Sequence, residues 1–185
     1  MDAETSFRIE ATDVVLRPYR GEDLDAIYDL TQDAEVRAYL PDWNVPKTQR
    51  ALWLQQDELP ENARFLGAVA AGGHVSRLRL RLAITERDTG RFVGWCCTGL
   101  KETLPPPNRE IVYAVAAPYR NRGYATQAVT ALVAYLVAET DVVAINAVAL
   151  VRNGASCRVL EQSGLTLVGL VTLDGAPYRH YQRVR

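Results

Sequence analysis

A strand–helix–strand pattern between residues 110 and 150 constrains the fold of this chain more than any other feature of its sequence. Glu110 to Val115 is predicted to form a strand, and Gly123 to Val137 carries apolar residues on one helical face. Val142 to Leu150 is rich in Val, Ala and Ile, which is typical of a central buried strand. Two strands joined by such a helix form a parallel pair with a right-handed crossover. The pattern therefore predicts a sheet that contains a parallel pair.

The remaining elements follow from apolar periodicity and from turn residues. Apolar residues alternate from Leu78 to Ile84, which predicts a half-buried strand, and Phe92 to Leu100 follows as its hairpin partner. Pro60 is predicted to end a helix that begins at Pro46. The further strands are predicted at Val14–Pro18, Thr166–Leu173 and Tyr178–Val184, and the helices at Gly21–Thr31, Ala34–Tyr39, Pro46–Leu59 and Ala155–Gln162. Together these elements predict one α/β (α+β) domain that spans residues 1–185.

Composition limits the classes of protein that the chain can represent. A net charge of -1 argues against binding nucleic acid through general basicity. The longest apolar stretch, Val142 to Val151, is too short to span a bilayer, and the first ten residues contain no apolar signal segment. We therefore expect a cytoplasmic protein without a membrane partner. Three cysteines and two histidines offer neither a disulfide framework nor a zinc spacing, so no metal site is expected.

The small net charge conceals two oppositely charged parts of the chain. Residues 1–70 hold 14 Asp and Glu against 7 Lys and Arg, whereas residues 71–185 hold 8 against 14. The two parts therefore carry net charges of -7 and +6. A single domain with this division could place an anionic ligand beside a cationic one.

The segment from Arg120 to Thr126 follows a predicted strand and opens a predicted helix. The first backbone N–H groups of a helix have no partner within it and point outward at the positive end of the helix dipole, which suits a phosphate. Gly123 allows close approach of the backbone, and Arg120 and Arg122 add positive charge. The segment contains neither a G-K-[ST] phosphate loop nor the three-glycine dinucleotide fingerprint. By itself it indicates either an anion-binding helix start or a solvated one.

Two motifs in this order resemble the GCN5-related N-acetyltransferases (the GNAT family), in particular the branch of the ribosomal-protein enzymes RimJ and RimL. Arg120 to Ala125 matches the family's [RQ]-x-x-G-x-[GA] loop in full, and Asn153 to Leu165 is similar to its N-x-x-[SA] element. Glu110 to Val115 resembles the branch's acidic strand, and the resemblance covers most of the chain. It implies the GNAT fold, a mixed, mostly antiparallel twisted sheet of about seven strands with helices on both faces and a splayed parallel pair of central strands.

The resemblance implies that the chain binds acetyl-coenzyme A. The pyrophosphate would lie against the amides of the loop, and the pantetheine arm would lie between the splayed strands. Backbone groups of Val115 would pair with that arm, Asn153 would meet its amides, and Ser156 would lie near the sulfur. The residues implied in cofactor binding are Val115, Arg120, Arg122, Gly123, Tyr124, Ala125, Thr126, Asn153 and Ser156.

The implied reaction is direct attack of an amine on the thioester, and it needs a base. At pH 7 an α-amine with a pKa of about 7.7–8.0 is roughly one-tenth free base, and a lysine amine with a pKa of about 10.4 far less. Glu110 is the candidate catalytic base, acting through a water molecule. It matches the acidic residue of the branch's strand, and apolar neighbours could raise its pKa. The alternative is a surface carboxylate at a strand end that pairs with Arg109.

The departing thiolate needs a proton or a hydrogen bond. Many family members place a tyrosine four residues after the Ser or Ala of the last motif, but Leu160 occupies that position here. Ser156 is the candidate catalytic residue for this role; the alternative is a serine that satisfies the amides of its own helix. Other possible donors, which the sequence does not rank, are Tyr113, Tyr119, Tyr124 and Tyr178.

The acceptor is expected to be a primary amine, either a protein N-terminus, which suits the RimJ/RimL resemblance, or a small molecule. Acids of the first predicted helices could form a wall that favours a cationic amine, or could be solvated; they are Glu22, Asp23, Asp25, Asp29, Asp33, Glu35 and Asp42. The alternative functions are a coenzyme A-binding sensor or interaction module without turnover, and an acyltransferase that uses a longer donor such as succinyl-coenzyme A. The chain is expected to be a monomer or a homodimer.

Overall fold

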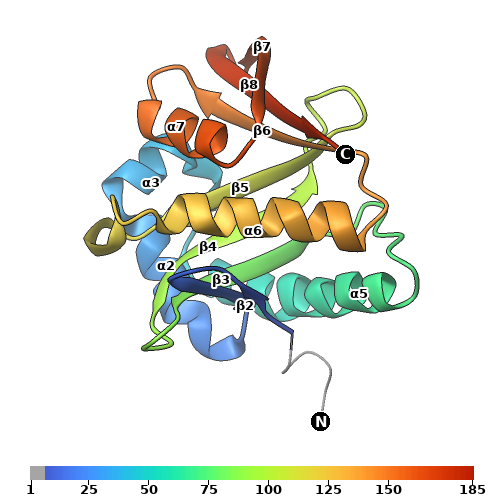
Figure 1. Ribbon diagram of the computed structural model, residues 1–185. Helices are drawn as coiled ribbons and strands as arrows, with labels where there is room; N and C mark the ends of the chain where they lie inside the picture. Colours follow the sequence, from blue (N-terminus) through green and yellow to red (C-terminus); the bar gives the residue numbers. More distant parts are fainter. Residues whose placement is uncertain (1–6) are drawn as a thin grey trace.

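Eight strands form a single mixed sheet in the computed structural model, which describes residues 7–185 (Figure 1). In chain order they are β1 (Ile9–Glu10), β2 (Val14–Pro18), β3 (Leu80–Glu86), β4 (Phe92–Leu100), β5 (Arg109–Val115), β6 (Ala144–Leu150), β7 (Thr166–Leu173) and β8 (Ala176–Val184). Across the sheet the order is β1–β2–β3–β4–β5–β6–β8–β7. β5 and β6 are parallel, and the other neighbouring pairs described are antiparallel. The predicted fold is confirmed, and the additional strand is the two-residue β1.

Helices cover both faces of the sheet. They are α2 (Leu24–Gln32), α3 (Ala34–Tyr39), α4 (Lys47–Leu52), α5 (Leu59–Ala70), α6 (Tyr124–Glu139) and α7 (Gly154–Gln162). A first apolar cluster joins one face to α6, which crosses the near side of the sheet in Figure 1, to α7 and to Phe65 of α5. A second cluster joins the opposite face to α2 and α3 through Ile27, Leu30 and Val36. The adjacent residues Cys96 and Cys97 of β4 belong to different clusters, as strand alternation requires.

The helical segment after Pro46 is longer than the sequence predicts. α4 passes into a π-helical stretch, Trp53–Glu58, and then into α5, so Pro60 does not end the helix. Pro60 lies in the first turn of α5, where its missing backbone N–H and fixed φ disturb a helix least. In the π-helical stretch Leu54 is buried, whereas the preceding Leu52 is 47% exposed.

The parallel pair of β5 and β6 is closed at one end and open at the other. Its register covers two residue pairs, Arg109 with Ile145 and Glu110 with Asn146. Asn146 holds the closed end, because its Nδ2 donates to the carbonyl oxygens of Pro107 at 2.9 Å and Arg109 at 3.1 Å. Beyond Glu110 no further pair joins the two strands within residues 7–185. The predicted splay is therefore present, and it opens a gap in the middle of the sheet.

Three further observations concern residues 7–185 only. No helix in this range has both the length and the apolar character needed to cross a membrane. No group of three or more His, Cys, Asp or Glu side chains in it could hold a metal ion. The three cysteines are buried and none forms a disulfide bond.

Candidate active site

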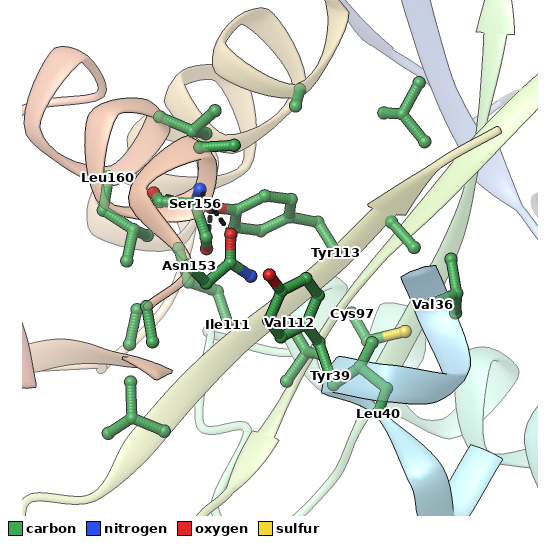
Figure 2. Close-up of a pocket in the computed structure, with 18 of the residues that line it drawn as sticks. Val36, Tyr39, Leu40, Cys97, Ile111, Val112, Tyr113, Asn153, Ser156 and Leu160 are labelled. Atoms are coloured by element: carbon green, nitrogen blue, oxygen red, sulfur yellow. Dashed lines mark hydrogen bonds between the residues drawn. The ribbon is translucent and has the colours of Figure 1, made fainter. Parts of the chain in front are cut away.

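A cleft of about 1020 Å³ opens where β5 and β6 separate, and it extends from the N-terminus of α6 to the start of β5. Residues of α3, β4, β5, β6, α7 and β8 also line it. Figure 2 shows its centre, where side chains of α3, β5 and the start of α7 converge. Every site residue predicted from the sequence lines this cleft except Arg122.

The edge of β5 presents backbone groups to the cleft. The Ala116 N–H donates to the carbonyl oxygen of Val93, next to β4, at 2.9 Å. Because hydrogen-bonded pairs alternate along an antiparallel ladder, the backbone N–H and C=O groups of Val115 and Tyr113 point the other way, into the gap. In agreement with this direction, the Arg120 Nε–H donates to the Val115 carbonyl oxygen at 3.0 Å. An extended chain in the gap could therefore pair with β5 as a strand would.

The N-terminus of α6 is uncapped and faces open space. Its N-cap is Gly123, with a φ of 78° in the left-handed region, and no side chain of the described residues caps the helix. The first backbone bond runs from the Gln127 N–H to the Gly123 carbonyl oxygen at 3.0 Å, which leaves the amides of residues 124–126 without helical acceptors. A Cβ at position 123 would meet only the Gln127 side chain, at 3.8 Å. These amides are therefore available to an anion.

The two arginines of this loop contact carboxylates of other segments. Arg120 binds the acidic part of the chain at the start of α3, with Nη2 at 2.7 Å from Asp33 Oδ1 and Nη1 at 2.5 Å from Glu35 Oε2. Arg122 is directed away from the cleft, with Nη1 at 3.6 Å from Glu86 Oε1 and its side chain 52% exposed. The two oppositely charged parts of the chain are thus partly joined by ion pairs. The loop presents amides to the cleft more than it presents charge.

The start of α7 brings Asn153 and Ser156 to the cleft beside Tyr113 (Figure 2). Asn153 is the N-cap of α7, and its Oδ1 accepts a hydrogen bond from the Ser156 N–H at 3.1 Å. The Ser156 Oγ lies 2.7 Å from the Tyr113 hydroxyl, which also donates to the Ser156 carbonyl oxygen at 3.1 Å. Ser156 therefore does not cap its own helix, contrary to the alternative considered from the sequence.

Tyr113 supplies a second hydroxyl group beside Ser156, whereas position 160 of α7 supplies none. Leu160, one turn after Ser156, is only 1% exposed and is apolar. Burial raises the pKa of Tyr113 well above its ordinary value, and the hydrogen bond to Ser156 opposes this to a smaller extent. The Tyr113 hydroxyl therefore stays protonated at neutral pH. Nothing in the sequence ranked Tyr113 above the other tyrosines, because the contact joins residues 43 positions apart.

Glu110 lies at the closed end of the gap between β5 and β6. Its neighbour Arg109 points to the opposite face and donates to the carbonyl oxygens of Ser76 at 2.5 Å and Leu78 at 3.0 Å, so the pairing of Glu110 with Arg109 is wrong. Burial raises the pKa of Glu110 from its usual 4.5 to about 7, and Lys101 opposes this rise. The carboxyl group is therefore near half-ionisation at neutral pH.

The acids of the first helices do not form a wall around the cleft. Of the seven named above, Glu35 and Asp42 line it, and Glu35 is already paired with Arg120. Asp23 is buried and bonded to Arg17 at 2.7 Å. The positively charged residues that line the cleft are Arg79, Arg81, Lys101, Arg120 and Arg158. The expected preference for a cationic amine therefore has little support in this geometry.

Comparison with protein families gives one match that covers most of the chain. A family model described as "Acetyltransferase (GNAT) domain" matches residues 13–166. These residues include the loop at the start of α6, both strands of the parallel pair and the start of α7. No curated protein matches the chain significantly.

Solved structures share the whole fold at low sequence identity. A GNAT-family acetyltransferase from Bacillus anthracis aligns with a TM-score of 0.75 and 18% identity, over 96% of this chain and 98% of its own. The aminoglycoside acetyltransferase AAC(6')-Ib, in complex with coenzyme A and kanamycin, aligns with a TM-score of 0.72 and 18% identity, over 93% of this chain and 95% of its own. RimL, a ribosomal L7/L12 alpha-N-protein acetyltransferase in complex with coenzyme A, aligns with a TM-score of 0.72 and 17% identity, over 96% of this chain and 98% of its own. At this level of identity the likeness concerns the fold.

Proposed function

The chain belongs to the GNAT acetyltransferase family, and we propose that it transfers an acetyl group from acetyl-coenzyme A directly to a primary amine. The observation that carries this proposal is one continuous cleft that joins the uncapped N-terminus of α6 to the carboxyl group of Glu110. The helix start suits a polyanionic donor, and a carboxyl group with a pKa of about 7 suits removal of a proton at neutral pH.

The donor is proposed to bind from the start of α6 to the start of α7. Acetyl-coenzyme A supplies the thioester that the amine attacks. The amides of residues 122–126 hold the pyrophosphate, with Gly123, Tyr124, Ala125 and Thr126 facing the cleft. Val115 pairs through its backbone and Asn153 through its side-chain amide with the extended arm. Arg120 acts mainly by fixing the loop to α3, and Arg122 adds a nearby positive charge.

Glu110 is proposed to act as the general base. Its Oε accepts the proton that the amine must lose, directly or through one water molecule, as the new N–C bond forms. At pH 7 a pKa of about 7 leaves about half of the carboxyl groups ionised and still basic enough to accept that proton. An ordinary carboxylate with a pKa near 4.5 would be a much weaker base, so the burial of Glu110 is the physical basis of the role.

Ser156 and Tyr113 are proposed to stabilise the sulfur that leaves as the C–S bond breaks. When Tyr113 donates its single hydroxyl hydrogen to Ser156 Oγ instead of to the Ser156 carbonyl oxygen, the serine hydrogen is free to be donated into the cleft. The 2.7 Å contact between the two oxygens allows this arrangement. The pair could thus replace the tyrosine that Leu160 displaces from α7. Proton transfer to the sulfur then balances the proton taken by Glu110.

The acceptor amine differs between solved structures of this fold. Relatives of this fold act on an aminoglycoside and on a ribosomal protein N-terminus, according to their descriptions. An α-amine is the more favourable acceptor on chemical grounds, because more of it is deprotonated at pH 7 than of a lysine amine. The same scaffold hosts many acceptors, so the fold does not select between a peptide and a small molecule.

Thiol release from acetyl-coenzyme A, measured with a panel of amines, tests the proposed activity. The panel contains peptides with free α-amines, amino acids, a polyamine and an aminoglycoside, and succinyl-coenzyme A serves as an alternative donor. We expect amine-dependent thiol release with acetyl-coenzyme A. Thermal stabilisation by coenzyme A without turnover of any amine would instead favour the sensor or interaction module.

A further inference from the structure

Two positively charged residues, Arg79 and Lys101, lie on the same face of the sheet as Glu110, and both line the cleft. β3 pairs with β4 so that Leu80 is opposite Thr98, which places Arg79 next to Gly99. Gly99 is in turn opposite Glu110 of β5. Arg79, Gly99 and Glu110 therefore form one row across three neighbouring strands, and all three line the cleft.

The absence of a side chain at Gly99 gives Arg79 its direction. A Cβ built at position 99 would lie 3.0 Å from Arg79 Cγ and 3.4 Å from its Cδ and Nε. The Arg79 side chain therefore lies flat across β4, over Gly99, instead of standing away from the sheet. This path carries its guanidinium toward the side of the sheet that holds Glu110.

Lys101 lies on the same side as Arg79. It follows Gly99 by two residues, so strand alternation directs both positions to one face, and its N–H donates to the Asn108 carbonyl oxygen at 2.9 Å. Its charge acts on the Glu110 carboxyl group, which shows that the two side chains are within electrostatic reach. Lys101 is partly exposed, and it lines the cleft.

Within residues 7–185, neither Arg79 nor Lys101 forms an ion pair with a carboxylate. Neighbouring cations differ in this respect. Arg77 pairs with Glu102, and Arg81 lies 3.1 Å from Glu58 and 3.0 Å from Glu61. Two cations without a carboxylate partner thus line the same cleft as the candidate base, and Glu35, an acid of that cleft, is already paired with Arg120.

We propose that Arg79 and Lys101 form an anion subsite for the acceptor, which is therefore a primary amine that also carries a carboxylate. The inference rests on the proposed acetyl transfer and adds the charge class of its acceptor. The amine lies at Glu110 while the carboxylate lies over Gly99, between the two cations. Charge-assisted hydrogen bonds to a carboxylate are short and strong, and the planar guanidinium of Arg79 can bind it through two N–H groups. A polycationic acceptor would be repelled from the same place.

Paired acceptors that differ only in this charge test the subsite. The first pair is a peptide amide that begins with Glu and the same peptide that begins with Gln; free glutamine and its α-amide, which lacks the α-carboxylate, form a second pair. We expect kcat/KM to be at least about tenfold higher for the acidic member of the preferred pair, mainly through a lower KM. The peptide pair and the amino-acid pair distinguish a protein N-terminus from a free amino acid as the source of the carboxylate.

Arg79→Gln and Lys101→Gln should each bring the acidic-to-neutral ratio of kcat/KM down toward 1. Arg77→Gln is the matched control, because Arg77 is exposed on the same segment, is paired with Glu102 and does not line the cleft. It should keep the ratio of the unmodified protein. Calorimetric binding of the N-acetylated acidic peptide should weaken in the two subsite variants and not in the control, which gives a readout independent of turnover.

Two results would overturn the subsite while leaving the acetyltransferase intact. One is turnover of amines with no preference, or with a preference for the neutral or cationic member. The other is an acidic-to-neutral ratio of kcat/KM that is as high in Arg79→Gln and Lys101→Gln as it is in the control Arg77→Gln. The absence of turnover with every amine would instead contradict the proposed function itself.

Discussion

The two ends of the cleft are built in different ways. The donor end consists of the loop and helix start from Arg120 to Thr126 together with the start of α7, and it presents mostly backbone groups. The proposed acceptor end consists of Arg79, Lys101 and Glu110, which come from three strands or their extensions and present side chains to the cleft. Arg120 and Arg122 of the loop have carboxylate contacts, whereas Arg79 and Lys101 have none within residues 7–185.

This difference has a consequence for specificity. Backbone amides at a helix start bind any phosphate that fits, so the donor end can stay the same while the acceptor changes. Side chains at the acceptor end can be exchanged without disturbing the helix or the splayed strands. Family membership therefore predicts the donor well and the acceptor poorly, and the charge of the acceptor end has to be read from this chain's own residues.

Gly123→Val should give the largest effect, because it changes the backbone conformation of the loop at the donor end. Position 123 has a φ of 78°, which a β-branched residue adopts only with strain, and its side chain would occupy the space beside the amides. Each lost hydrogen bond to a charged group is worth about 1.5–3 kcal/mol. We expect no detectable coenzyme A binding by calorimetry at concentrations that saturate the unmodified protein.

Gly90→Val is the control for Gly123→Val. Gly90 has a φ of 67° in the hairpin turn between β3 and β4, and a Cβ there would meet nothing within 4 Å. The substitution therefore imposes a similar backbone strain at a position that does not line the cleft. Coenzyme A affinity should be unchanged in this variant. Equal affinity in both variants would show that the donor end does not depend on the loop backbone.

Glu110→Gln, at the acceptor end, should give the second-largest effect. We expect kcat/KM at pH 7 to fall by about 10²–10⁴-fold, the usual contribution of a general base. The loss should be smaller at high pH, where the amine is already deprotonated. The unmodified protein should lose activity as Glu110 is protonated below about pH 7, in addition to the loss from protonation of the amine, and the variant should keep only the latter. Glu102→Gln, at an exposed carboxylate after β4, is the control and should keep the original pH–rate profile.

The stability of the same variant checks the raised pKa without any substrate. A carboxyl group whose pKa rises from 4.5 to about 7 on folding stabilises the fold fully below pH 4.5 and loses that contribution as pH rises through about 7. This difference in pKa between the unfolded and folded states corresponds to a stability contribution of at most about 3 kcal/mol. Between pH 5 and pH 9 the free energy of unfolding of the unmodified protein should therefore decrease relative to that of Glu110→Gln. Parallel stability curves for the two proteins would contradict the raised pKa.

Tyr113→Phe should give the smallest effect, about tenfold in kcat, because it removes one hydrogen bond at the junction of the two ends. The loss should shrink with thioester donors whose thiol is more acidic, since a better leaving group needs less stabilisation. Tyr135→Phe removes a buried hydroxyl that has no partner within the described residues and does not line the cleft, so it should leave kcat unchanged. A loss that is the same for every donor would argue for a structural role of Tyr113.

The sequence predicted secondary-structure elements and motifs more accurately than it predicted contacts between residues. The helix predicted at Ala155–Gln162 is confirmed as α7, and Gly164, with a φ of 81°, follows its last turn. Pro60 misled the prediction of a helix end, because the preceding π-helical stretch lets the chain continue through it. The pairing of Glu110 with Arg109 failed for a similar reason, since neighbours on a strand face opposite sides of the sheet.

By itself the sequence determined the strand–helix–strand unit, the helix start at Gly123 and the family. These features depend on residues close together in the chain, whose conformations local sterics and backbone hydrogen bonding dictate. Only the tertiary structure decided which charges remain free and which hydroxyl meets Ser156. Those outcomes depend on the register of β3, β4 and β5 and on the packing of α7 against β5, which join residues distant in sequence. Burial, the cause of the raised pKa of Glu110, likewise exists only after the chain has folded.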